Sequence, residues 1–238
     1  MITAVTFDLW NTLISDMNYD DLRVKYLGEV LNEHGVSRDY EEIRAAYVEA
    51  HEYAHQVWVD ENYRHVPCLE RLACILERLN VELPRNLTLH TARNFEETLL
   101  ADPPPLVTDA KRVLQELSQD YGLGIISDTG VTPGRVLRRI LEDAQVLDFF
   151  TCTIFSDETG YNKPHRVMFE TALKSLGGKP SEAVHIGDLL QTDVAGAKSV
   201  GMMAVWLNSC GRVNKGQYLP DFEVSKLPDL LDILETIP

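Results

Sequence analysis

The sequence predicts an α/β protein with a doubly wound parallel sheet and an all-helical segment inserted near its start. Two observations support this prediction. Apolar runs alternate with stretches of helical periodicity after residue 103, which is typical of a parallel sheet covered on both faces. Residues 19–101, by contrast, show helical patterning without a convincing strand pattern.

The predicted sheet is assembled from short apolar runs. Buried strands are expected at 2–7, 123–127, 183–186 and 202–207, with weaker candidates at 151–155 and 222–224. Helical periodicity predicts helices at 109–118, 133–142, 167–176, 192–200 and 226–235. Glycines mark several of the joins, as at Gly122, Gly187 and Gly201. This alternation predicts a Rossmann-like core.

The inserted segment predicts a helical cap at residues 16–102, with the core at 1–15 and 103–238. One apolar stripe is formed by Leu22, Tyr26, Leu27, Val30 and Leu31, with Asp20 or Asp21 expected as the helix N-cap. A second stripe is formed by Ile43, Tyr47, Ala50, Ala54, Val57 and Trp58. Two more helices are expected at 68–79 and 87–100. Three prolines at 103–105 predict a stiff return to the core.

Composition limits the classes of function. Lys and Arg number 22 against 37 Asp and Glu, a net charge of −15, which argues against binding nucleic acid or an anionic membrane surface. An anionic substrate would therefore need a metal or a placed cation. No apolar stretch approaches the roughly 20 residues that span a bilayer, and the first residues resemble a strand rather than a signal peptide. The four cysteines form no CxxC pair, so we expect a cytoplasmic protein with reduced thiols. The oligomeric state is not indicated.

Candidate chemistry lies where the apolar runs end, because ligands of open parallel sheets bind at the carboxyl ends of the strands. The first run ends in Asp8 and the second in Ser127, while Asp188 and Asp193 follow the third. Lys163 lies in a loop ahead of a predicted helix. Carboxylate oxygens suit Mg²⁺, and a lysine neutralises phosphate. The set predicts phosphoryl transfer assisted by Mg²⁺.

Four motifs resemble those of the haloacid dehalogenase superfamily, whose members are mostly phosphatases. In chain order they are Asp8-Leu9-Trp10-Asn11-Thr12, Ser127, Lys163 and Gly187-Asp188-Leu189-Leu190-Gln191-Thr192-Asp193. The resemblance covers the core at 1–15 and 103–238. The insert is similar to the helical caps of the dehalogenase-like and phosphoglycolate-phosphatase-like branch. One such motif is weak evidence, whereas four in order are specific.

The resemblance implies a role for each motif residue. Asp8 would attack phosphorus and become an aspartyl phosphate. Asp8, Asp188 and the backbone carbonyl of Trp10 would bind Mg²⁺, with Asp193 as a ligand or a supporting group. Thr12 and Ser127 would hydrogen-bond phosphoryl oxygens, and Lys163 would neutralise charge on the nucleophile and phosphate. The expected partner is a small phosphorylated metabolite.

Trp10 departs from the phosphatase pattern, which has a second Asp there as general acid and base. An indole can do neither, and losing such a group typically costs about 10²–10⁴-fold in rate. One hypothesis is a phosphatase that uses good leaving groups or an acid from its cap. A second is a 2-haloacid dehalogenase-like hydrolase, although the two extra carboxylates would repel a haloacid. A third is a binding or regulatory protein with a degenerate site.

Several other residues invite a functional interpretation. His51-Glu52-Tyr53-Ala54-His55 matches the HExxH zinc string, but only Glu70, Glu77 and His65 are loose candidates for a third ligand, and short strings recur by chance. Asp128 adds a negative charge beside the expected phosphate site, so it is expected to turn outward or hold a backbone amide. Candidate cap contacts to a substrate are Arg64, His65, Tyr19 and Arg23.

Overall fold

The computed structural model describes residues 1–237 and contains a six-stranded parallel sheet. The strands are β1 (Ala4–Phe7), β2 (Gly122–Ser127), β3 (Phe150–Phe155), β4 (Ala183–Gly187), β5 (Met203–Leu207) and β6 (Phe222–Val224). Their order across the sheet is β3-β2-β1-β4-β5-β6. All six predicted strands are present, and the central position of β1 places its carboxyl end between those of β2 and β4.

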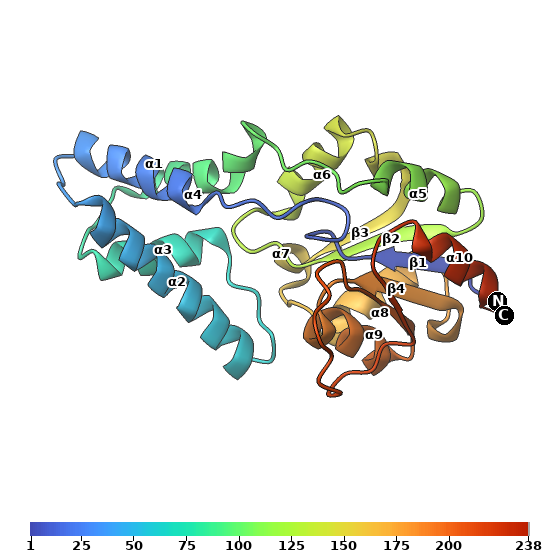
Figure 1. The fold of residues 1–238 in the computed structure, drawn as a ribbon. Coiled ribbons are helices and arrows are strands. Elements are labelled where there is room, and N and C mark those ends of the chain that lie inside the picture. The colour runs from blue at the N-terminus through green and yellow to red at the C-terminus, as the bar shows by residue number, and fades with distance from the viewer. Residues whose placement is uncertain (238) are drawn as a thin grey trace.

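Helices cover both faces of the sheet, which confirms the predicted doubly wound core (Figure 1). On one face, Val5 and Phe7 of β1 share a core with α5 (Ala110–Leu117), α6 (Gly134–Asp143) and α10 (Asp229–Thr236). On the other, Ala4 shares a core with α8 (Arg166–Leu176) and α9 (Ala195–Val200). Successive strand residues point to opposite faces, so burial on both sides explains why these runs are continuously apolar.

Short helical turns complete the core between these elements. They are η2 (Leu147–Phe149), α7 (Ser156–Thr159), η3 (Pro180–Glu182) and η4 (Leu190–Val194), the last being a π-helix. Within the described residues, no helix combines the length and the apolar character needed to cross a membrane.

The insert forms a helical cap beside the core (Figure 1). Its helices are α1 (Asp20–Glu33), α2 (Tyr40–Asp60), α3 (Cys68–Arg78), α4 (Arg85–Glu97) and the short η1 (Thr98–Leu100). They pack around their own apolar cluster, to which Val131 of the core also contributes. The cap therefore has a core of its own, to which the loop after β2 adds one apolar residue.

Two details of the first cap helix differ from the prediction. Tyr19 precedes α1, so the expected N-cap at Asp20 or Asp21 is wrong; the backbone N–H of Asp20 is instead satisfied by Asn18 Oδ1 at 2.9 Å. Leu22 is 49% exposed, whereas Val24 is buried. Leu27, Val30 and Leu31 of the predicted stripe are buried as expected, so the stripe differs from the prediction only near the start of the helix.

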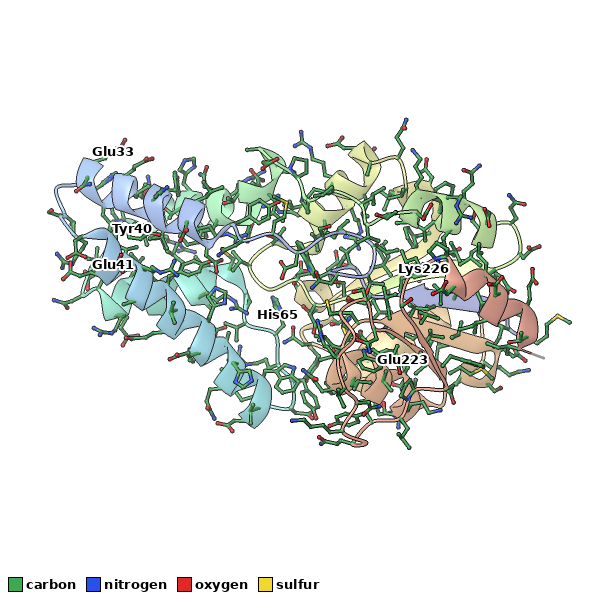
Figure 2. All side chains as sticks on the ribbon, viewed as in Figure 1. Glu33, Tyr40, Glu41, His65, Glu223 and Lys226 are labelled. Carbon is green, nitrogen blue, oxygen red and sulfur yellow. The ribbon has the colours of Figure 1, made fainter. Side chains whose placement is uncertain are left out.

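The cap is connected to the core at two places. The two linkers pair with each other, because Ser15 N–H donates to Pro105 O and Val107 N–H donates to Leu13 O, both at 2.9 Å. On the other side, the loop before α3 joins the loop before α8: His65 N–H donates to Gly160 O at 2.9 Å. Figure 2 shows His65 between the cap helices and the core.

Candidate active site

Asp8 lies just beyond the end of the central strand. Its backbone N–H donates to Ile186 O at 2.8 Å, which extends the β1–β4 ladder by one residue. A tight turn follows, in which Leu9 O accepts the N–H groups of Leu13 at 2.8 Å and Ile14 at 3.0 Å. Thr12 on this turn donates its hydroxyl to Asp8 Oδ2 at 3.3 Å. The turn thereby fixes a buried carboxylate at the carboxyl end of the central strand.

Lys163 reaches this carboxylate from the loop before α8. Its ammonium is only 3% exposed and lies 2.5 Å from Asp8 Oδ1 and 2.7 Å from Asp193 Oδ1. Its backbone is held from two sides: Lys163 N–H donates to Asp128 Oδ1 at 2.8 Å, and the indole of Trp58 in the cap donates to Lys163 O at 3.0 Å. Both the core and the cap therefore position this lysine.

Asp193 is locked in place by the loop after β4. Its Oδ2 accepts Leu189 N–H at 3.0 Å, and His185 Nε2 lies 3.2 Å from Oδ1. A Cβ at Gly187 would lie 2.2 Å from Asp193 Cγ, so only glycine allows this approach. His185 is a buried polar residue within an apolar strand, a signal that the sequence interpretation overlooked.

Asp188 completes a group of three carboxylates. Oxygen atoms of Asp8, Asp188 and Asp193 all lie within 4.8 Å of one another. The backbone of Asp188 is fixed by Trp206, whose indole donates to its carbonyl at 3.0 Å, and Arg212 Nη2 lies 3.5 Å from Asp188 Oδ2. The structure therefore brings together the predicted residues from three separate segments of the chain.

Burial and charge shift the pKa values of these groups in different directions. Burial raises the pKa of Asp8 to about 7, although Lys163 opposes this shift. Burial also raises the pKa of Asp188 to about 6. For Asp193, burial would raise the pKa, but Lys163 and His185 outweigh it and hold the carboxyl ionised. Burial disfavours the ammonium of Lys163, yet the surrounding carboxylates raise its pKa above the usual range.

Trp10 has a structural role at the junction of cap and core. Its indole donates to Asp128 O at 3.2 Å, linking the loop after β1 to the loop after β2. The ring also packs against a small cluster formed by Tyr19, Leu99, Val136 and Ile140. The side chain that replaces the second Asp is therefore committed to packing and to one structural hydrogen bond.

The side chains of Ser127, Thr12 and Asp128 each make a hydrogen bond near the site. Ser127 is fully buried and donates to Asp128 O at 3.2 Å. Thr12, likewise fully buried, contacts Asp8. Asp128 holds the backbone amide of Lys163, one of the two roles expected for it. Burial raises the pKa of Asp128 to about 6.

Two of the four candidate cap contacts, His65 and Arg23, bond the core, whereas Arg64 and Tyr19 bond other residues of the insert. Arg64 pairs with Glu61 and Glu70, and His65 Nδ1 lies 3.1 Å from Ser156 Oγ in the core. Tyr19 OH donates to Asp102 O at 2.8 Å, and Arg23 donates to Thr132 Oγ1 at 3.1 Å. None of these four lines the cavities at the site, within the part of the chain that the structure covers.

Among residues 1–237, the HExxH histidines are not joined by a third potential zinc ligand. His51 and His55 line a cleft between cap and core, together with Arg71 of α3, which the sequence interpretation did not single out. The one cluster of three potential metal-binding side chains in residues 1–237 is formed by Asp8, Asp188 and Asp193.

Comparison with known proteins identifies the family. The family model of the haloacid dehalogenase-like hydrolases matches residues 2–201. The chain belongs to this family. This hydrolase is 33% identical to a glyceraldehyde 3-phosphate phosphatase of Pyrococcus abyssi, over 99% of this chain and 94% of the relative.

Solved structures agree on the fold of the hydrolase. A HAD phosphatase from Thermococcus onnurineus superposes with a TM-score of 0.68 at 27% identity, over 98% of each chain. A 2-haloacid dehalogenase from Pseudomonas syringae pv. Tomato DC3000 gives a TM-score of 0.73 at 24% identity, over 99% of each chain. At that identity the second likeness shows a shared fold alone.

Proposed function

We propose that this hydrolase is a Mg²⁺-dependent phosphatase that cleaves a small phosphorylated metabolite through an aspartyl phosphate on Asp8. The observation that supports the proposal is the close approach of four side chains at the carboxyl ends of the strands: Asp8, Asp188, Asp193 and Lys163. The relative from Pyrococcus abyssi, named as a phosphatase, supports the same class of substrate.

The donor set fits Mg²⁺. Hard carboxylate oxygens are the ligands that this ion prefers, and three such groups lie within 4.8 Å of one another. Asp8, Asp188 and the Trp10 carbonyl would hold the ion, with Asp193 supporting it. A bound Mg²⁺ would supply positive charge for phosphoryl oxygens in a protein whose net charge is −15.

In the proposed reaction, a carboxylate oxygen of Asp8 attacks phosphorus while the bond to the leaving oxygen breaks, giving an aspartyl phosphate and an alkoxide, phenolate or carboxylate, which takes any proton it needs from solvent water. Water then attacks phosphorus, which releases inorganic phosphate and restores the carboxylate. Lys163 neutralises charge on the nucleophile, and Thr12 orients the second oxygen of Asp8. Ser127, the other hydroxyl assigned to phosphoryl oxygens, lies buried one residue from the cavity-lining Asp128.

Trp10 restricts which esters can react quickly. Because an indole cannot protonate the departing oxygen, the rate should depend strongly on how well that oxygen leaves without a proton. We expect aryl and acyl phosphates to react far faster than alkyl phosphates. A rate independent of leaving-group pKa would contradict this expectation.

A phosphatase panel with and without Mg²⁺ tests the proposal on wild type, Asp8→Asn and Trp10→Asp. Activity should require Mg²⁺, be lost in Asp8→Asn, and rise in Trp10→Asp toward alkyl esters. Activity that survives in Asp8→Asn would overturn the proposed nucleophile. A full screen without turnover, with a phospholigand still bound, would favour the binding or regulatory alternative.

Dehalogenation is the second candidate, and Trp10 is the observation that favours it, because the dehalogenases that the chain resembles carry an aromatic residue there. Asp188 and Asp193 oppose it, since buried carboxylates would repel a haloacid anion. Halide release from 2-chloropropionate in EDTA would reverse the ranking of the two candidates.

A further inference from the structure

A second cavity adjoins the one that contains Asp8 and Lys163. The two have volumes of about 380 and 450 Å³, a size typical of small-molecule sites. Both are lined by Asp128, Gly130 and Thr192, so they meet along these three residues. A substrate whose phosphoryl group lies at Asp8 would extend past them into the second cavity.

The cap supplies basic side chains to this second cavity. Arg71 of α3 and His51 and His55 of α2 line it opposite the core residues. Arg71 is anchored by one hydrogen bond, from Nε to Val66 O at 3.0 Å. Throughout residues 1–237, neither of its two Nη groups has a hydrogen-bond partner, which leaves both available to a ligand.

The surrounding acids are engaged elsewhere. Glu70, the neighbour of Arg71 in sequence, pairs with Arg64 at 3.0 Å and accepts the hydroxyl of Tyr53 at 2.7 Å. No carboxylate oxygen in the described chain lies within 4.0 Å of an Arg71 nitrogen, although acidic residues outnumber basic ones by 15. A partly buried arginine without a carboxylate partner is unusual in so acidic a protein.

Arg71 and His51 lie close enough together to interact electrostatically. Burial lowers the pKa of Arg71 and of His51, and the positive charge of Arg71 lowers that of His51 further. The charged groups facing the pair are Arg23, Asp20 and Glu70 from the cap and Asp128 from the core. Asp128 already accepts the amide of Lys163, and Asp20 pairs with Arg23 at 3.4 Å.

Thr192 provides an independent observation at the boundary of the two cavities. The residue is 9% exposed, and its hydroxyl lacks a hydrogen-bond partner among the described residues. Leaving a buried hydroxyl unpaired is costly. A polar substrate group passing between the cavities would satisfy it.

We propose that Arg71 and His51 form a second anion-binding subsite, and that the substrate of this hydrolase carries a carboxylate or a second phosphate at the end remote from the reacting phosphoryl group. Arg71 would bind that group through its Nη atoms, because a planar guanidinium matches the oxygens of a carboxylate or phosphate. The proposal deepens the proposed phosphatase function and depends on it for the position of the reacting group.

The test compares three phosphates with the same three-carbon chain: 3-(phosphonooxy)propanoate, propane-1,3-diyl bisphosphate and 3-hydroxypropyl phosphate. Wild type should favour at least one of the two compounds with a second anionic group over 3-hydroxypropyl phosphate by about 10- to 100-fold in kcat/KM, the range expected for a hydrogen bond to a charged group. Comparing the first two distinguishes a carboxylate from a phosphate.

Substitutions then assign that preference to Arg71. In Arg71→Met the ratio should fall to about one, while Arg71→Lys should retain part of it through its charge. Arg78→Met is the matched control: Arg78 lies on the same helix, is exposed and pairs with Glu49 at 2.6 Å. Its substitution should leave the ratio unchanged.

A binding measurement separates the subsite from the chemistry. The Asp8→Asn variant, loaded with Mg²⁺, should bind the preferred compound with two anionic groups more tightly than 3-hydroxypropyl phosphate. The double variant Asp8→Asn/Arg71→Met should bind the two compounds equally. Equal binding of all three compounds would overturn the subsite, whatever the rates. The expected binding preference, together with no turnover of alkyl, aryl or acyl phosphates by wild type, would instead overturn the phosphatase function and leave the subsite standing.

Discussion

Replacing Lys163 by Met tests the electrostatic design of the site. The substitution keeps an unbranched side chain of similar length but removes the one ammonium that lies within 2.7 Å of both Asp8 and Asp193. These carboxylates are 5% and 1% exposed, so solvent compensates only weakly for the lost partner. Breaking a buried ion pair by removing one partner typically costs about 3–5 kcal/mol. We expect a loss of this size in the free energy of unfolding.

The assay is urea denaturation in EDTA at about pH 8, where carboxyl groups are largely ionised. Lys198→Met is the matched control, because Lys198 lies 2.7 Å from Asp221 but is 44% exposed, and such surface pairs contribute about 0–1 kcal/mol. The loss in Lys163→Met should shrink as the pH is lowered, because a protonated carboxyl needs no cation. A loss no larger than that of Lys198→Met would refute the reasoning.

Three further predictions follow from the same geometry. Mg²⁺ at 100 times its Kd should stabilise wild type by about 2.7 kcal/mol. In thermal denaturation, the Asp188→Asn variant should lose most of this stabilisation by Mg²⁺. A stabilisation equal to that of wild type would exclude Asp188 as a ligand. In EDTA, the stability of wild type relative to Asp8→Asn should fall from about pH 4 to about pH 7 and then level off, because native Asp8, with a pKa of about 7, retains a proton that the unfolded chain has lost. A difference that rises with pH in urea titrations would contradict this sign. Gly187→Ala should lower activity at least about tenfold, because the new Cβ would meet Asp193 Cγ at 2.2 Å; unchanged kcat/KM would show that the loop adjusts freely.

The sheet could be predicted because its strands are buried on both faces. A short, continuously buried run such as Val5 to Phe7 is typical of a central parallel strand, and each run ends where the polar chemistry begins. Asp8, Asp188 and Asp193 were accessible to the same reasoning, since parallel strands bring their carboxyl ends to one edge. Lys163 was also a candidate from its place in a loop ahead of a helix, but that position alone says nothing about its ion pairs.

The cap was less predictable, because helical stripes are degenerate. Leu22 fits the spacing of the first stripe but is exposed, while Arg23 is buried because its guanidinium donates to Phe95 O and Thr132 Oγ1. No sequence pattern marks Arg71, since a lone arginine on a helix is usually solvated. The sequence singles out His51 only as part of the HExxH string. Its proposed role in the anion subsite depends instead on where the cap lies over the core.

Trapping the aspartyl phosphate tests the central claim most directly. Wild type is mixed with Mg²⁺ and an aryl phosphate whose phosphoryl group is radiolabelled. The reaction is quenched in acid, and the protein is analysed for covalently bound label. Because Trp10 cannot activate water, the intermediate should decay slowly, so label should accumulate on Asp8, be released by hydroxylamine, and diminish in Trp10→Asp. Turnover without labelled protein, or equal labelling of Asp8→Asn, would contradict the proposed mechanism.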